Sequence, residues 1–262
     1  TSAMTWSGGA TIGGTGTLTT NSGVTTTIPT NNGPILSRTW ENNGTINWTN
    51  TNGNSFTING TLNNNSGANF NIVTDNSSTD ILGTGTINNA GTLTLNSTAS
   101  ELDVSPTFNN TGTVAVTDGD LQLAGTGIDT GIYTVASGAT LTFANASGTR
   151  DLQSGSSVTG AGTGATSGGG TRTFGGTYNV TGATTLGGGT NTLSASTISN
   201  LGVLSISGGT SNTIDGANIL ISGNVTITGG TTTISSSTIT SLGDLSVSSG
   251  ITTFNTGNTF SV

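Results

Sequence analysis

The sequence contains no cysteine, no histidine and no lysine, and its only basic residues are Arg38, Arg150 and Arg172. Without cysteine there is neither a disulfide framework nor a thiolate metal site. Three cations in 262 residues and a formal net charge of -8 also leave no basic patch that could neutralise phosphates. We therefore expect no nucleic-acid partner and no attraction to anionic membranes.

Most side chains used in acid-base and nucleophilic catalysis are missing as well. Eleven carboxylates remain, and a glycosidase needs only two at a suitable separation. The best local candidate is Asp118-Gly119-Asp120, which we interpret as a polar turn before the strand Leu121–Leu123, with calcium binding and catalysis as weaker alternatives. The other aspartates do not recur at any fixed period. We expect no catalytic residue, no metal site and no cofactor.

Long apolar runs are also absent, and no stretch approaches the ~20 residues that span a bilayer. The residues Thr1 to Trp6 lack the basic and apolar regions of a secretory leader. We therefore expect no membrane insertion in this segment.

What the chain does contain is glycine, serine, threonine and asparagine, which together make up about three-fifths of it. Such a composition favours turns and strands over helices. The apolar residues alternate with polar ones in short runs such as Val203–Ser207 and Asn224–Thr228, each bounded by small residues. This period of two predicts half-buried strands rather than a disordered linker.

Two markers repeat together in the last hundred residues, at spacings of about 20. The first is a glycine that opens a strand, and the second is a threonine followed by a large apolar residue. The glycines are Gly162, Gly182, Gly202, Gly223 and Gly243, and the second marker occupies Thr173-Phe174, Thr192-Leu193, Thr213-Ile214, Thr233-Ile234 and Thr253-Phe254. A shared period predicts one structural unit, here called a rung, that is repeated by stacking.

The rung that begins at Gly202 predicts three short strands, Val203–Ser207, Asn212–Ile214 and Ile219–Ser222. One rung cannot cover its own apolar residues, so neighbouring rungs must stack over a continuous core. The expected fold is all-β, a right-handed parallel β-helix (β-solenoid) with about three strands per ~20-residue rung. The expected inward residues of this rung are Leu204, Ile206, Ile214, Ile219 and Ile221.

Upstream the same element recurs at uneven spacing, as GTIN at Gly44 and Gly85, GTLN at Gly60 and GTVAV at Gly112. We predict a single solenoid domain over 1–262, with irregular rungs and longer turns in 1–161 and regular rungs in 162–262. An average rung of about 20 residues predicts roughly 13 rungs. The last residues stop on a strand without a cap, so we expect this to be a fragment of a longer repeat protein.

The stretch GGTYNVTGATTLGGGTNTL, from Gly175 to Leu193, resembles the strand repeats of autotransporter passengers and of other large repeat-rich bacterial surface proteins. The segment Thr5–Thr20 resembles another part of such an array. The resemblance implies an extracellular or cell-surface location and a role in adhesion, aggregation or envelope architecture, with no shared catalytic residue. We expect a structural or adhesive rod segment, whose partners would be glycans or neighbouring copies and repeats of the same protein.

Two further classes of function stay open, a ligand-binding solenoid for polysaccharide or ice and a β-helix polysaccharide-degrading enzyme. The candidate ligand-binding residues are Trp40, as a sugar platform, and the threonines Thr173, Thr192, Thr213 and Thr233. Each of these threonines has a second hydroxyl residue two positions earlier, so the hydroxyls would form two parallel files. Against a flat threonine array, residues such as Arg172 would then point into the core, where a lone guanidinium is costly. We therefore expect these strands to begin only at the second threonine.

Overall fold

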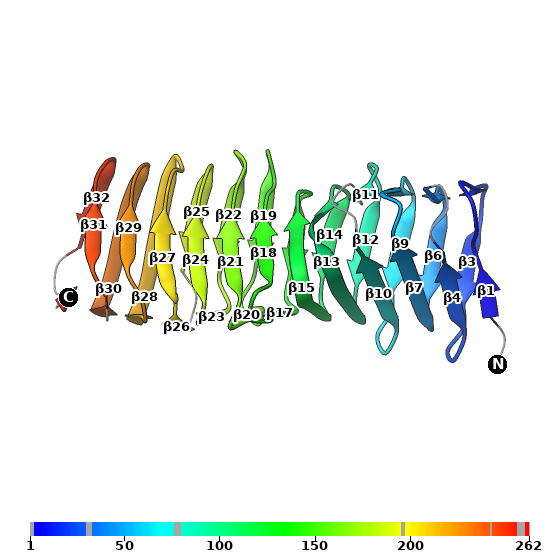
Figure 1. Ribbon diagram of the computed structural model, residues 1–262, viewed down its shortest axis with the longest axis horizontal. Coiled ribbons are helices and arrows are strands. Elements are labelled where there is room, and N and C mark those ends of the chain that lie inside the picture. The colour runs from blue at the N-terminus through cyan, green and yellow to red at the C-terminus, as the bar shows by residue number, and fades with distance from the viewer. Residues whose placement is uncertain are drawn as a thin grey trace. The chain divides into compact units, whose positions relative to one another are not determined.

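The computed structural model describes residues 3–29, 33–75, 80–194, 197–241, 243–255 and 260–261. Every regular element in this described part is a β-strand, and the strands stack in parallel as a β-solenoid of about 11 rungs, with about three strands in each ~21-residue rung (Figure 1). The predicted fold class is confirmed, and the predicted count of 13 rungs is too high. Within the same ranges, no helix is long and apolar enough to cross a membrane.

The chain divides into two compact units, Thr1–Gly127 and Ile128–Val262. In the first unit the strands follow one another around three faces. One face contains β1 (Ala3–Thr5), β4 (Thr25–Ile28), β7 (Thr45–Asn50), β10 (Asn69–Thr74), β13 (Thr92–Val104) and β15 (Thr113–Leu123). The next contains β3 (Thr17–Thr20), β6 (Thr39–Asn42), β9 (Thr61–Asn64), β12 (Thr86–Asn89) and β14 (Thr107–Asn110). The third contains β2 (Thr11–Ile12), β5 (Ile35–Leu36), β8 (Phe56–Ile58), β11 (Asp80–Leu82) and the end of β13.

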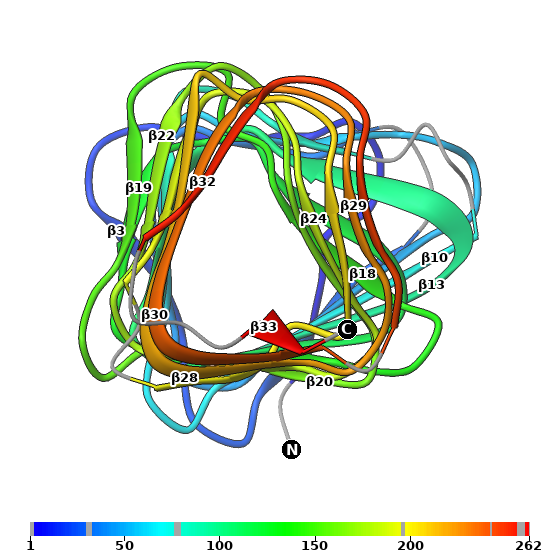
Figure 2. The same cartoon turned by 90° about the vertical axis from the view of Figure 1, so that its left-hand side faces the viewer.

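The second unit repeats this plan. Its first face contains β16 (Gly127–Asp129), β19 (Thr149–Leu152), β22 (Thr171–Phe174), β25 (Thr190–Leu193), β28 (Ser211–Ile221), β30 (Thr231–Ser241) and β32 (Ile251–Phe254). Its second contains β18 (Thr140–Phe143), β21 (Thr163–Thr166), β24 (Ala183–Leu186), β27 (Val203–Ile206), β29 (Val225–Ile227) and β31 (Leu245–Val247). Its third contains β17 (Ile132–Val135), β20 (Ser157–Gly160), β23 (Thr177–Val180) and β26 (Thr197–Asn200), and β33 (Phe260–Ser261) pairs with the end of β30. Seen end-on, successive rungs of this unit lie over one another around a shared interior (Figure 2).

The core is built by alternation along each strand, which sends every second side chain inward. In the first unit, for example, Ile46, Phe70, Leu93 and Val114 occupy one aligned inward position, and each is at most 1% exposed. The predicted inward residues of the rung at Gly202 are all buried, which confirms that prediction. They are Leu204, Ile206, Ile214, Ile219 and Ile221.

One predicted boundary in that rung is wrong. Instead of two strands separated by Asp215-Gly216-Ala217, the structure has the single strand β28. Asp215 and Gly216 stay in register with Ser235 and Ser236 of β30. The segment Asp215-Gly216-Ala217 therefore continues the backbone pairing between β28 and β30 and does not interrupt it.

The glycine marker is explained by close approach between rungs. A Cβ atom added at Gly182 would lie 2.2 Å from the carbonyl oxygen of Gly162, and one added at Gly202 would lie 2.2 Å from that of Gly182. Any larger residue there would collide with the backbone of the preceding rung. These glycines therefore recur because each rung stacks closely on the rung before it.

Candidate functional site

Two files of outward hydroxyls cross four neighbouring strands of the second unit, β22, β25, β28 and β30. In the second file, Thr173, Thr192, Thr213 and Thr233 are directly aligned, and each is half-buried. In the first file, Thr171, Thr190 and Ser211 are aligned in the same way. We call this surface the Thr face, and it consists of Thr171, Thr173, Thr190, Thr192, Ser211, Thr213, Thr231 and Thr233. The structure therefore brings together all four threonines that the sequence singled out.

The strands of the Thr face begin at the first hydroxyl residue and not at the second, so that prediction is wrong. The residues between the two files point inward, and none of them is exposed: Arg172, Asn191, Asn212 and Thr232. The objection that a buried Arg172 would be too costly fails because its guanidinium is not alone. It is surrounded by acceptors from neighbouring rungs.

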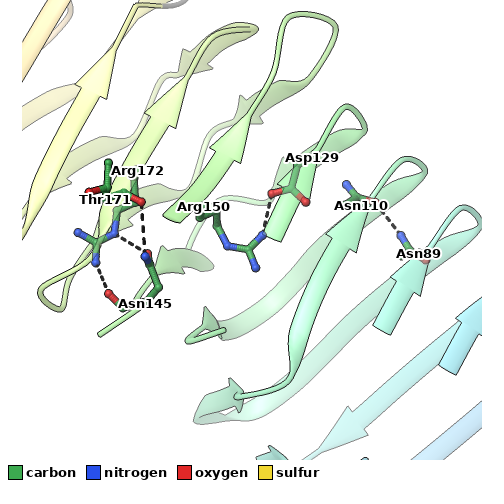
Figure 3. Close-up of polar contacts among 7 residues, drawn as sticks. All are labelled: Asn89, Asn110, Asp129, Asn145, Arg150, Thr171 and Arg172. Atoms are coloured by element: carbon green, nitrogen blue, oxygen red, sulfur yellow. Dashed lines mark hydrogen bonds and ion pairs between the residues drawn. The ribbon is translucent and has the colours of Figure 1, made fainter. Parts of the chain in front are cut away.

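Arg172 donates from Nε to Asn145 Oδ1 at 2.9 Å and from Nη2 to the Asn145 carbonyl at 2.8 Å (Figure 3). It also donates to Asn191 Oδ1 at 3.3 Å and to the carbonyl oxygen of Ser167. All of these acceptors are uncharged, and burial lowers the pKa of Arg172 to about 10. The side chain thus stays protonated at neutral pH, held by neutral oxygens.

The polar interior continues on both sides of Arg172. Asn191 donates to Asn212 Oδ1 at 2.8 Å, and Asn212 donates to the Gly208 carbonyl at 2.8 Å. In the other direction, Arg150 is aligned with Arg172 and forms a fully buried ion pair with Asp129 at 2.7 Å. We call this set the polar column, and it consists of Asp129, Asn145, Arg150, Arg172, Asn191, Asn212 and Thr232.

The first unit has a polar ladder of its own, made of asparagine. Inside the coil, Asn42 donates to Asn64, Asn64 to Asn89 and Asn89 to Asn110, at 2.7 to 2.8 Å. We call these four residues the Asn ladder. Outside the coil, Asn88 donates to Asn63 at 2.8 Å in the same way. Sequence reasoning missed both ladders, although the Asn-Asn pairs that end three of these strands could have indicated them.

Trp40 is buried and cannot serve as a sugar platform, so the structure rules out this candidate ligand-binding residue. It is aligned with Leu18 and Leu62 on the inward side of its sheet and has no exposed surface. Its indole Nε1 donates to Thr20 Oγ1 at 2.8 Å. Trp48, which shares the inward side of β7 with Ile46, is also buried, with an exposure of 2%.

The acidic segment Asp118-Gly119-Asp120 lies within the strand β15, at an irregularity in its pairing with β13. Gly119 has a φ of 77°, and Asp120 is aligned with Glu101. Two positions further on in β13, Asp103 has its pKa raised to about 6 by desolvation and by the charges of Glu101 and Asp80. No group of three or more Asp, Glu, His or Cys side chains in the described ranges could hold a metal ion.

Comparisons with protein-family models, with curated proteins and with solved structures give no match. The function is therefore inferred from the geometry of the two units. The arrangement offers two features with chemical content, the polar interior that joins one rung to the next and the hydroxyl array of the Thr face.

Proposed function

We propose that this chain is a structural segment of a secreted or cell-surface bacterial protein, whose role is to extend or display a binding region. One observation carries the proposal: in both units, buried asparagines of neighbouring rungs bond to one another at matching positions. In the first unit the Asn ladder joins residues 22, 25 and 21 positions apart. In the second unit Asn191 and Asn212 are 21 positions apart.

Such ladders fix the register between neighbouring rungs. An amide that donates to one rung and accepts from another is satisfied only when all three rungs are aligned, and a buried amide without its partner is costly. Stability then accumulates rung by rung, so the number of rungs can vary without a new core. That is the property a spacer requires.

Composition and resemblance support the extracellular part of the proposal. Low charge, the absence of cysteine and the Gly175–Leu193 repeat are typical of large bacterial surface arrays. Adhesion to glycans or to neighbouring copies of the protein belongs to the same proposal. With Trp40 inside the core, a glycan contact would have to use other side chains.

Deletion of one whole rung tests the proposal. Removing Gly91–Thr111 should bring Gly112 to the place of Gly91 over Ala68, since Gly91 and Gly112 make the same close approach to the preceding rung. We expect the shortened chain to keep a strand-rich circular dichroism spectrum and a cooperative unfolding transition. Inserted between a surface anchor and a reporter domain, it should still display the reporter.

The matched control removes only Gly91–Glu101, which is part of the same rung and destroys the register of the strands that follow. We expect this chain to lose its cooperative transition and its display of the reporter. If the whole-rung deletion fails in the same way, the rungs are not modular and the proposal is wrong. Release of reducing sugar from polysaccharides by the intact chain would favour an enzyme instead.

A further inference from the structure

We propose that the Thr face binds ice, which is a function beyond the structural role and independent of it. The first observation is that its hydroxyls are uncommitted: within the described part of the chain, none of its eight side chains hydrogen-bonds to a protein group. Hydroxyls elsewhere do so, as when Thr184 bonds to Tyr178 and Thr117 bonds to the Leu95 carbonyl. The hydroxyls of the Thr face are therefore available to water.

The second observation is that the strands of the Thr face keep a regular register and that none of its eight side chains is charged. Pairing from β22 to β25 and from β25 to β28 runs without a register shift. Directly beneath it, Arg172, Asn191 and Asn212 are hydrogen-bonded to one another in sequence. Side-chain ladders of this kind hold stacked sheets flat against their intrinsic twist. Two outward carboxylates border the Thr face: Asp151 on β19, which is aligned with Thr173, and Asp215, two positions beyond Thr213 on β28.

The spacing of the array matches the ordering of water. Aligned threonines on neighbouring parallel strands lie about 4.8 Å apart, and the two files on one strand lie about 6.6 Å apart. Water molecules at the surface of hexagonal ice repeat at comparable distances in two directions. Threonine also has a stiff χ1 angle, so its methyl and hydroxyl groups hold their positions. A rigid lattice of methyls and hydroxyls can therefore order water into an ice-like layer.

A polysaccharide fits this face less well. Flat sugar rings are usually held by exposed aromatic side chains that offer a large apolar surface with a polar edge. Among the aromatic side chains whose exposure the structure describes, only Phe254 is exposed, at 38%, and it lies at an inward position of β32 and not on the Thr face. The face thus has hydroxyls and methyls but no ring platform, which favours ice.

The test is accumulation of the purified chain in growing ice, together with thermal hysteresis of the solution. Because the chain has no lysine and no cysteine, a dye on the N-terminal amine labels one site far from the Thr face in sequence. We expect the labelled chain to concentrate in the ice and to produce measurable hysteresis. Thr192→Lys and Thr213→Lys, which place a long cation in the centre of the array, should each abolish most of both signals.

The matched control is Thr185→Lys, an outward and half-buried threonine of β24 on another face of the second unit. It should keep both signals, and circular dichroism with thermal unfolding should show that every variant folds. Exclusion of the intact chain from ice overturns the proposal, and so does an equal loss in Thr185→Lys. Retention on insoluble cellulose or chitin that Thr192→Lys removes would assign the face to polysaccharide and would also overturn it. The rung deletion in the first unit leaves the Thr face untouched, so the two proposals can fail separately.

Discussion

Arg150 donates a hydrogen bond to Asp129 from the next rung of the second unit, with 2.7 Å between Nη1 and Oδ2 and with neither side chain exposed. A buried pair of this kind stabilises a fold little in net terms, because two charges lose their water, but removal of one partner leaves the other charge buried. The stability of the fold should therefore fall sharply when only one member of the pair is replaced.

The single variant Asp129→Asn should destabilise the chain by about 3–5 kcal/mol, because the guanidinium of Arg150 loses its counter-charge. The double variant Asp129→Leu/Arg150→Met removes both charges and should be clearly more stable than the single variant. Chemical denaturation followed by circular dichroism measures both. If the double variant is the less stable of the two, the unpaired charge of Arg150 is not what destabilises the single variant.

The Asn ladder of the first unit gives a second prediction. Asn64 accepts from Asn42 and donates to Asn89, so Asn64→Ala removes one hydrogen bond from each of these two buried amide groups. We expect a loss of about 1–3 kcal/mol in unfolding free energy. Asn63→Ala, next in sequence and half-buried on the outside, should cost less, because water can replace the bonds that Asn63 makes with Glu41 and Asn88.

The inward apolar residues could be predicted from the sequence, whereas the inward polar residues could not. Alternation alone places Leu204 and Ile206 in the core, because apolar burial needs no particular partner. The position of Arg172 depends on acceptors at Asn145 and Asn191, which are 27 and 19 residues away along the chain. The order of residue types along one strand does not reveal such partners. The sequence therefore predicts, wrongly, that the guanidinium of Arg172 is too costly to bury.

The burial of Trp40 could not be predicted from the sequence, for a related reason. Its polar neighbours Arg38 and Glu41 favour exposure, but Arg38 lies before β6 begins, and alternation along β6 places Trp40 on the side of the strand opposite to Glu41. Its indole N–H then finds an acceptor in Thr20 one rung away. By contrast, Trp48 shares its face with Ile46, so the same alternation predicts it correctly.

The close approach of glycines gives a third prediction. Gly182→Ala would bring a methyl group to 2.2 Å from the carbonyl oxygen of Gly162, and backbone cannot give way as a flexible side chain would. We expect destabilisation of at least about 1–3 kcal/mol, seen as a lower melting temperature. Gly208→Ala is the matched control, because its nearest neighbour is 3.5 Å away, at the nitrogen of Gly188. It should leave stability unchanged or slightly raised, through the reduced entropy of the unfolded chain.

The last prediction concerns pH and rests on Asp103 in the first unit. Desolvation and the carboxylates of Glu101 and Asp80 raise its pKa from 3.8 to about 6, so the folded chain binds this proton more tightly than the unfolded chain does. The contribution of Asp103 to stability is therefore fully present below about pH 4 and is lost as the pH rises through about 6. Asp103→Asn should be more stable than the parent chain at pH 7.5, and this advantage should disappear near pH 4. Asp118→Asn removes one negative charge from an exposed position and controls for net charge; a pH-dependent gain of the same size in Asp118→Asn would show that general charge repulsion, and not the setting of Asp103, causes the effect.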